Sequence, residues 1–407
     1  MTFTVAIFLL VYVAMGAGQV PGFKVDRTGA AVVGALVLIA AGRLSPQDAW
    51  DAIDYKTVAL LFGLMVVSAA FIVSGFYGWA THRFATLDLS PPALLAVLIV
   101  ISGLLSSVLT NDVVVVAMTP LLVAITLSRG LNPVPFLLGF CFAANTGSAG
   151  TIIGSPQNII AAQGLGMSFN EFLRVAAVPA LASLPIVWGI VAFLYRGRWH
   201  GTASGEAVAL PPTDHRETVK AAAVTLIVIL AFVATDWPKE LVAMAAAAVL
   251  LVNRRIASSD MLGHVDGNLL LLLMCLFIVN AALAATGLPQ QLLGDLKAAG
   301  IDLEQPLTLF LVVSALSDTV GNNPAVMLLI PYVGGERSDG ALGAAFALGT
   351  GFSSNMFVFG SLAGIIVVEQ AKKKGVAISF GEFTRSGLPI SLACMAMAMG
   401  WIAFLGR

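Results

Sequence analysis

The chain has 407 residues, of which 58% are hydrophobic and 11% are charged, and its formal net charge is −1. Soluble domains carry about 25% charged residues. A soluble core of this length does not need so much apolar surface. The composition therefore excludes a soluble protein and predicts an integral membrane protein whose solvent is the lipid bilayer.

Six apolar segments follow one another along the first half of the chain. Several are long enough to cross a hydrocarbon core of roughly 30 Å, but the second is short. The first segment lacks a basic region and a small-residue cleavage site, so we expect a retained span rather than a signal peptide. The segments cover residues 3–19, 28–42, 56–74, 92–128, 135–163 and 175–195.

The sequence repeats itself at an offset of 211 to 212 residues. Asp48, Asp54 and Gly75 recur as Asp260, Asp266 and Gly287. NDVVVVAMTP (111–120) recurs as NNPAVMLLIP (322–331), and SFNEFLR (168–174) as SFGEFTR (379–385). Three anchors in the same order predict two homologous halves. We expect the first repeat at 1–200, a cytoplasmic linker at 201–218 and the second repeat at 219–407.

Segment 92–128 is too long for one span, and a polar Asn-Asp pair interrupts it. It is either two spans or one re-entrant helical hairpin, and 303–333 repeats it. If both are hairpins, the halves insert in opposite orientations, and 14 of the 21 Lys and Arg residues lie on one side. The positive-inside rule then places both termini outside the cytoplasm. We expect an all-α fold of two inverted-topology repeats, each with five transmembrane helices, one broken helix and one re-entrant hairpin.

Two further segments are predicted to be helices that break inside the membrane. NTGSAGTIIGSPQN (145–158) and TGFSSNMFVFGS (350–361) separate apolar helical stretches. Gly, Ser, Asn and Pro disfavour a helix interior. The freed backbone groups and half-helix ends would bind a solute near the midplane. The alternative is a pair of water-facing loops between separate helices.

Asp112 lies at the expected tip of the first hairpin, where its repeat counterpart is the uncharged Asn323. One interpretation is that Asp112 only caps a helix end. The other is that it also takes up and releases a proton, because a charged carboxylate at membrane depth is costly. Asp318, close to the second tip, is another candidate for proton coupling.

Three stretches, LTNDVVVVAMTPLLVAI, AANTGSAGTIIGSPQNII and FGSLAGIIVVEQAKKKGVAISFGEFTRSG, resemble the ion transporter superfamily over the whole chain. The chain is most similar to the ArsB-type arsenite permeases, which are related to sodium–dicarboxylate symporters. It departs from the symporters, whose hairpin tips carry Ser-Asn-Thr, because its tips read Thr-Asn-Asp and Gly-Asn-Asn. The resemblance implies a solute site between the two tips and the two breaks. The implied binding residues are Thr110, Asn111, Asn145, Thr146, Gly147, Ser148, Gly154, Ser155, Asn158, Asn322, Asn323, Ser353, Ser354, Asn355, Gly360 and Ser361.

The resemblance implies proton-coupled efflux of arsenite or antimonite by alternating access, without a cofactor. Arsenous acid is neutral and presents only hydroxyl groups, which amide, hydroxyl and backbone groups can bind. Neither predicted break contains Lys or Arg, which argues against a strongly anionic solute. The same chemistry admits silicate and borate; dicarboxylates and sodium coupling are further alternatives.

Other functions are less compatible with the sequence. It lacks an HExxH motif and a phosphate-binding GxxxxGK[ST] motif, so we expect neither a metalloenzyme nor an ATPase. A channel is disfavoured because inverted repeats are typical of alternating access. The expected partners are a small solute, a proton or sodium ion and lipid, with no nucleic acid; a separate ATPase subunit and a homodimer are both compatible. The expected location is a prokaryotic-type inner membrane.

Overall fold

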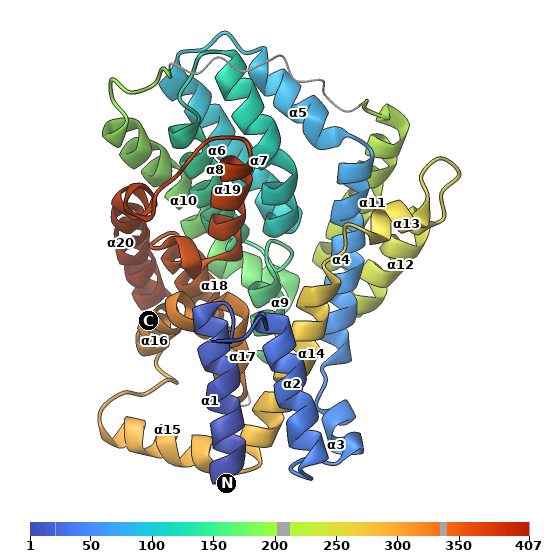
Figure 1. Ribbon diagram of the computed structural model, residues 1–407, viewed down its shortest axis with the longest axis vertical. Coiled ribbons are helices and arrows are strands. Elements are labelled where there is room, and N and C mark those ends of the chain that lie inside the picture. The colour runs from blue at the N-terminus through green and yellow to red at the C-terminus, as the bar shows by residue number, and fades with distance from the viewer. Residues whose placement is uncertain (21, 202–211, 334–339, 407) are drawn as a thin grey trace.

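The structure, a computed structural model, describes residues 1–20, 22–201, 212–333 and 340–406. Within these ranges every regular element is a helix, which confirms the all-α prediction (Figure 1). The helices of the first half are α1 (Thr2–Ala17), α2 (Arg27–Ala40), α3 (Pro46–Asp51), α4 (Tyr55–Val73), α5 (Phe76–Ala85), α6 (Pro91–Val108), α7 (Asn111–Ser128), α8 (Pro133–Ser148), α9 (Pro156–Gly164) and α10 (Phe169–Leu194).

The second half contains the same succession of elements. These are α11 (His215–Ala234), α12 (Lys239–Leu251), α13 (Ser258–Leu262), α14 (Gly267–Ala284), α15 (Leu288–Ala298), α16 (Pro306–Val320), α17 (Asn322–Leu329), η1 (Ile330–Tyr332), α18 (Gly340–Ser353), η2 (Val358–Gly360), α19 (Leu362–Lys373) and α20 (Phe380–Leu405). Ten residues of the predicted linker, 202–211, lie outside the described residues.

Corresponding helices of the two halves pack reciprocally and point in opposite directions. Helix α4 packs against α12, and its counterpart α14 packs against α2; likewise α7 contacts α19, and α17 contacts α9. In Figure 1, α5 lies at the top of the molecule and its counterpart α15 at the bottom. The two halves are therefore inverted with respect to each other, as predicted.

Seven described helices are long and apolar enough to cross a membrane: α4, α6, α7, α10, α11, α14 and α20. Four apolar helices are shorter, namely α1, α2, α16 and α18. Helix α2 has only 14 residues and would extend about 21 Å, less than the hydrocarbon core. The predicted segment 28–42 is therefore a partial span. Helix α2 begins at Arg27, which lines a cavity inside the bundle.

The segment at 92–128 forms a hairpin whose tip is buried. Leu109 and Thr110 alone separate α6 from α7. At the open end, Arg129 Nη1 at the end of α7 donates to the carbonyl of Ala85, 3.0 Å away, just before α6. At the tip, the hydroxyls of Thr110 and Ser68, which lies within α4, are 3.2 Å apart. The hairpin therefore enters and leaves at one end and stops inside the bundle.

Both predicted broken helices are present, but each break is narrower than expected. Helix α8 continues to Ser148, so the first break is 149–155 instead of 145–158; α18 continues to Ser353, so the second is 354–361. The side-chain amide of Asn158 donates to the carbonyls of Ser148 (2.9 Å) and Thr151 (2.8 Å), which satisfies the end of α8. The alternative of water-facing loops is wrong, because Ile152, Ser155 and Gly360 are buried.

The runs SFNEFLR and SFGEFTR begin the two longest helices. Ser168 Oγ accepts from the backbone N–H of Glu171 (3.2 Å), and the Glu171 carboxylate accepts from the N–H of Ser168 (2.7 Å). Ser379 Oγ accepts from the N–H of Glu382 in the same way (3.1 Å). The spacing of Ser and Glu is that of a capping box, so the runs fix where α10 and α20 begin.

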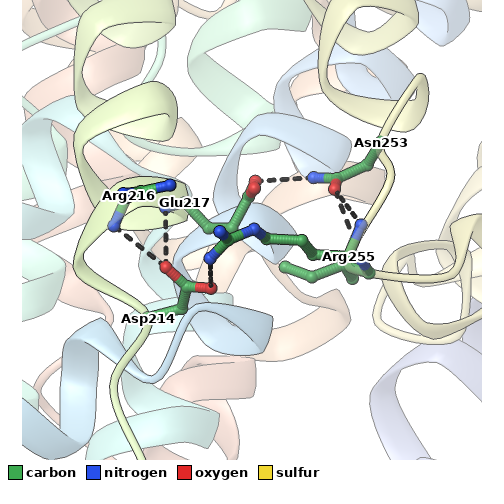
Figure 2. Close-up of polar contacts among 6 residues, drawn as sticks. Asp214, Arg216, Glu217, Asn253 and Arg255 are labelled. Carbon is green, nitrogen blue, oxygen red and sulfur yellow. Dashed lines mark hydrogen bonds and ion pairs between the residues drawn. The ribbon is translucent and has the colours of Figure 1, made fainter.

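A polar cluster joins the beginning of α11 to the segment after α12 (Figure 2). The Asp214 carboxylate accepts from the backbone N–H groups of Arg216 (3.0 Å) and Glu217 (3.3 Å) and from Arg255 Nη1 (3.0 Å). The Asn253 amide donates to Glu217 (2.6 Å). The bond from Arg255 lowers the pKa of Asp214. The cluster fixes the turn that precedes α13 and α14.

Candidate functional site

A cavity of about 240 Å³ lies between the two hairpin tips and opens to the second break. Its wall is formed by the end of α1, the beginnings of α2, α7, α9, α14 and α19, the second tip from Val320 to Pro324 and the end of the second break. The lining residues are Met15, Arg27, Thr28, Asn111, Asp112, Gln157, Asp266, Asn268, Leu269, Leu272, Val320, Gly321, Asn322, Asn323, Pro324, Phe359, Gly360, Ser361, Leu362 and Ala363.

The second tip is bound to the second break through Asn322. Gly321, the single residue between α16 and α17, has φ of 94°, a conformation that L side chains rarely adopt. Ser317 Oγ donates to Asn322 Oδ1 (2.5 Å), and Asn322 Nδ2 donates to Ser354 Oγ (2.9 Å). These bonds hold the tip in place and leave the neighbouring Asn323 on the cavity wall.

At the first tip, hydrogen bonds are made by Asn111 and not by the side chain of Asp112. The backbone N–H of Asn111 donates to the carbonyl of Gly154 in the first break (3.0 Å), and Asn111 Oδ1 accepts from the N–H of Asp112 (2.9 Å). Among the described residues, the Asp112 carboxylate accepts no hydrogen bond and forms no ion pair. The capping interpretation of Asp112 is therefore wrong, and its carboxylate faces the cavity.

A buried amide network joins α8 to the second break beside the cavity. Asn145 Nδ2 donates to Asn355 Oδ1 (2.9 Å) and to Ser361 Oγ (3.0 Å), and Asn355 Nδ2 donates to the carbonyl of Phe142 (3.2 Å). Because Ser361 also lines the cavity, this network connects the cavity wall to the interior of both repeats.

The predicted site residues fall into two groups. Asn111, Asp112, Asn322, Asn323, Gly360 and Ser361 line the cavity. The others do not line the cavity and lie in the hairpins, in the breaks and in the helix ends that flank the breaks: Thr110, Asn145, Thr146, Gly147, Ser148, Gly154, Ser155, Asn158, Asp318, Ser353, Ser354 and Asn355.

Several polar atoms in this second group are buried without a hydrogen-bond partner among the described residues. They include the hydroxyls of Thr146 and Ser155 and Oδ1 of Asn158. Buried polar groups are nearly always paired, so such a concentration indicates a functional region. Asp318 approaches Gly360 so closely that a Cβ atom on Gly360 would lie 2.7 Å from Asp318 Oδ1. Gly360 is therefore needed where the second break passes Asp318.

Five of the polar or charged lining residues were not predicted from the sequence as site residues: Arg27, Thr28, Gln157, Asp266 and Asn268. They lie at the beginnings of α2, α9 and α14. The sequence had predicted that neither break contains Lys or Arg, but it made no such prediction for these helices. The cavity as a whole does contain a cationic side chain, because Arg27 lines it. The signals in the sequence were the repeat anchor Asp266 and the charged pair Asp26-Arg27 at the edge of an apolar segment.

This architecture, with two inverted repeats around a polar cavity inside the bundle, defines a multi-pass secondary membrane transporter. Residues 10–351 match the family described as citrate transporter (CitMHS). The chain belongs to this family, which is part of the ion transporter superfamily.

Individual relatives agree with this assignment. The uncharacterised transporter Mb2703 of Mycobacterium bovis is 30% identical over 417 residues, which cover 97% of this chain and 96% of the relative. A Dictyostelium discoideum protein named transporter arsB is 30% identical over 157 residues, 39% of this chain and 28% of that protein. The crystal structure of the Alcanivorax borkumensis YdaH transporter, described as having an unusual topology, has a TM-score of 0.56 and 17% identity over 100% of this chain and 97% of that one. This last similarity concerns the fold alone.

Proposed function

We propose that the protein exports arsenite and antimonite in exchange for protons by alternating access. The observation that carries the proposal is the cavity between the hairpin tips, with the Asp112 carboxylate unpaired on a wall of amide and hydroxyl groups. Arsenous acid can donate its hydroxyl protons to carboxylate and amide oxygens and accept from amide N–H groups. The sequence similarity to the protein named arsB supports the same substrate.

The charges of the cavity favour a solute without a large negative charge. Arg27 contributes one positive charge, while Asp112 and Asp266 contribute two carboxylates. A dianion would lie beside like charges in a partly dehydrated space, which is unfavourable unless protons neutralise the carboxylates. A neutral oxyacid does not meet this repulsion.

Proton coupling is assigned to Asp112, with Asp318 as the second candidate. Neither carboxylate forms an ion pair within the described residues. An unpaired carboxylate inside a membrane protein is costly in its charged form, so binding and release of a proton can be linked to solute binding. A sodium ion bound by the same carboxylates is the alternative coupling ion.

The remaining assignments follow from the sequence pattern. We propose that residues 1–200 and 219–407 act as the two transport repeats, joined by a cytoplasmic linker at 201–218. The excess of basic residues on one side supports a prokaryotic inner membrane with both termini outside the cytoplasm. The proton gradient is the proposed energy source, with no requirement for an ATPase subunit.

A carboxylate anion such as citrate or a dicarboxylate is a second candidate. The family description and the guanidinium of Arg27 on the cavity wall favour it. A citrate ion could bind if Asp112 and Asp266 were protonated in the same step.

Uptake into proteoliposomes containing the purified protein distinguishes these candidates. Arsenite, antimonite, silicate, borate, succinate and citrate would each be tested with an imposed pH gradient and, separately, a sodium gradient. We expect saturable arsenite and antimonite uptake that requires the pH gradient and not sodium. Saturable citrate or succinate uptake without arsenite uptake would contradict the proposal in favour of the second candidate.

A further inference from the structure

Arg27 lines the cavity, and within the part of the chain that the structure describes its charge has no ion-pair partner. It is the first residue of α2, where Asp26 caps the helix by accepting from the N–H of Gly29 (2.8 Å). Among the described residues, Arg27 forms no ion pair, and its buried Nε atom has no hydrogen-bond partner. A buried guanidinium N–H without an acceptor is unfavourable unless a ligand supplies one.

The charged groups that share the cavity with Arg27 are Asp112, from the first tip, and Asp266, from the beginning of α14. Both carboxylates are separated from the guanidinium by more than an ion-pair distance. The carboxylate of Asp266 accepts from the N–H of Leu269 (2.9 Å). The hydroxyl of Thr28 donates to the carbonyl of Asn268 (3.4 Å), which joins the beginnings of α2 and α14 beside Arg27.

The repeat provides an internal comparison. Lys239 occupies the matching position as the first residue of α12, at the same offset of 212 that relates Asp54 to Asp266. Its ammonium group donates to the carbonyl of Met167 (3.1 Å), and Lys239 does not line this cavity. In the second repeat, Lys239 is therefore bound by a carbonyl of the protein. In the first repeat, Arg27 is left free to bind a ligand.

We propose that Arg27 binds an oxygen atom of the transported solute and selects for oxyacids. Its planar donors suit two oxygens of one acid group, such as those of an arsenic oxyacid or a carboxylate. The solute would then be held between the tips on one side and α2 on the other. This inference rests on the proposed function only in taking the cavity as the transport site; it holds for either candidate substrate class.

The test compares three variants, R27Q, R27K and K239Q, in proteoliposomes with the solute that the wild type transports. We expect R27Q to raise KM by at least about 10-fold, the loss expected for a charge-assisted hydrogen bond, with Vmax changed by less than about two-fold. R27K should recover part of the affinity, and K239Q should keep the wild-type KM. An unchanged KM in R27Q, or an equal rise in K239Q, would overturn the inference.

A binding measurement separates this inference from the proposed function. Millimolar arsenite, succinate or citrate should raise the melting temperature of the purified wild type and of K239Q, but not that of R27Q, since a ligand stabilises the state that it binds. Arsenite transport with an unchanged KM in R27Q contradicts the Arg27 inference alone. Citrate transport with a raised KM in R27Q contradicts arsenite export alone. A wild type that no oxyacid stabilises contradicts the inference.

Discussion

At the scale of single residues, the unusual feature is a carboxylate that the protein leaves unpaired. Asp112 follows Asn111, whose side chain accepts from the backbone N–H of Asp112, and the counterpart of Asp112 in the second repeat is Asn323. The asymmetry is therefore not needed to build a hairpin, because the second hairpin forms without it. A group that the architecture does not require and that faces a cavity is a candidate for function.

Replacing Asp112 by Asn tests its role with little structural change, because the variant reproduces the residue of the other repeat. We expect solute exchange without a gradient to continue. Accumulation driven by a pH gradient should fall by about 10-fold or more, because the group that carries the proton is lost. The measurement is uptake into proteoliposomes, with and without the gradient.

The matched control is Asp88→Asn, because Asp88 is exposed between α5 and α6. It should transport at the wild-type rate. If the Asp112 variant also accumulates solute at the full rate under the gradient, Asp112 is not the proton carrier and Asp318 becomes the candidate to test.

At the scale of elements, helix α20 lies in close contact with the second break at Asn355, which belongs to the buried amide network beside the cavity. A Cβ atom on Gly387 in α20 would lie 1.8 Å from the carbonyl oxygen of Asn355. Asn355 accepts from Asn145 and donates to Phe142. Any side chain at position 387 must therefore displace Asn355, the residue that joins the second break to α8.

We expect Gly387→Ala to lower the stability of the protein by about 1–3 kcal/mol, the usual effect of overpacking, and to reduce transport. Thermal unfolding in detergent measures the first effect. Gly400→Ala is the control in the same helix, since a Cβ atom added at Gly400 would have no neighbouring atom within 4 Å. Equal melting temperatures for the two variants would show that the contact with Asn355 does not constrain α20.

The sequence predicts most of these elements because their signals are local. The repeat anchors, the interrupted apolar segment at 92–128 and the Gly- and Ser-rich stretches identify the hairpins and the breaks. The limits of the breaks were predicted less well, because burial and the side chain of Asn158 keep Asn145–Ser148 helical despite their low propensity. The caps at Ser168 and Ser379 were not predicted, because the runs that contain them were used only as repeat anchors.

The wall of the cavity was only partly predictable. Asn111 and Asn322 lie at tips that the repeat identifies, but Arg27 and Asp266 come from helices outside the hairpins. Their proximity depends on how α2 and α14 pack together, and no local pattern encodes this long-range contact. The sequence therefore predicts the polar residues at the hairpin tips and at the end of the second break, and misses those at the beginnings of α2, α9 and α14.

At the scale of the whole molecule, the inverted arrangement places matching loops on opposite faces of the membrane. Ser128, at the end of the first hairpin, and Ala299, which precedes α16, are both exposed. The native cysteines, Cys141, Cys275 and Cys394, are all buried and offer little background labelling.

An impermeant maleimide should label Ser128→Cys only from the cytoplasmic side and Ala299→Cys only from the opposite side in oriented vesicles, because the positive-inside rule sets the orientation. Labelling of both from the same side would contradict the inverted topology. If Ala299→Cys were labelled from the cytoplasmic side and Ser128→Cys from the opposite side, the inverted topology would still hold. Only the placement of both termini outside the cytoplasm would be contradicted.

The central claim is that the solute binds between the two hairpin tips. Hydrogen exchange followed by mass spectrometry, with and without saturating transported solute, measures this without altering the protein. We predict that peptides covering Thr110–Asp112 and Gly321–Asn323 both exchange more slowly when the solute is bound, while α15 is unaffected. Saturating solute that leaves both tips exchanging at the unliganded rate would contradict the account.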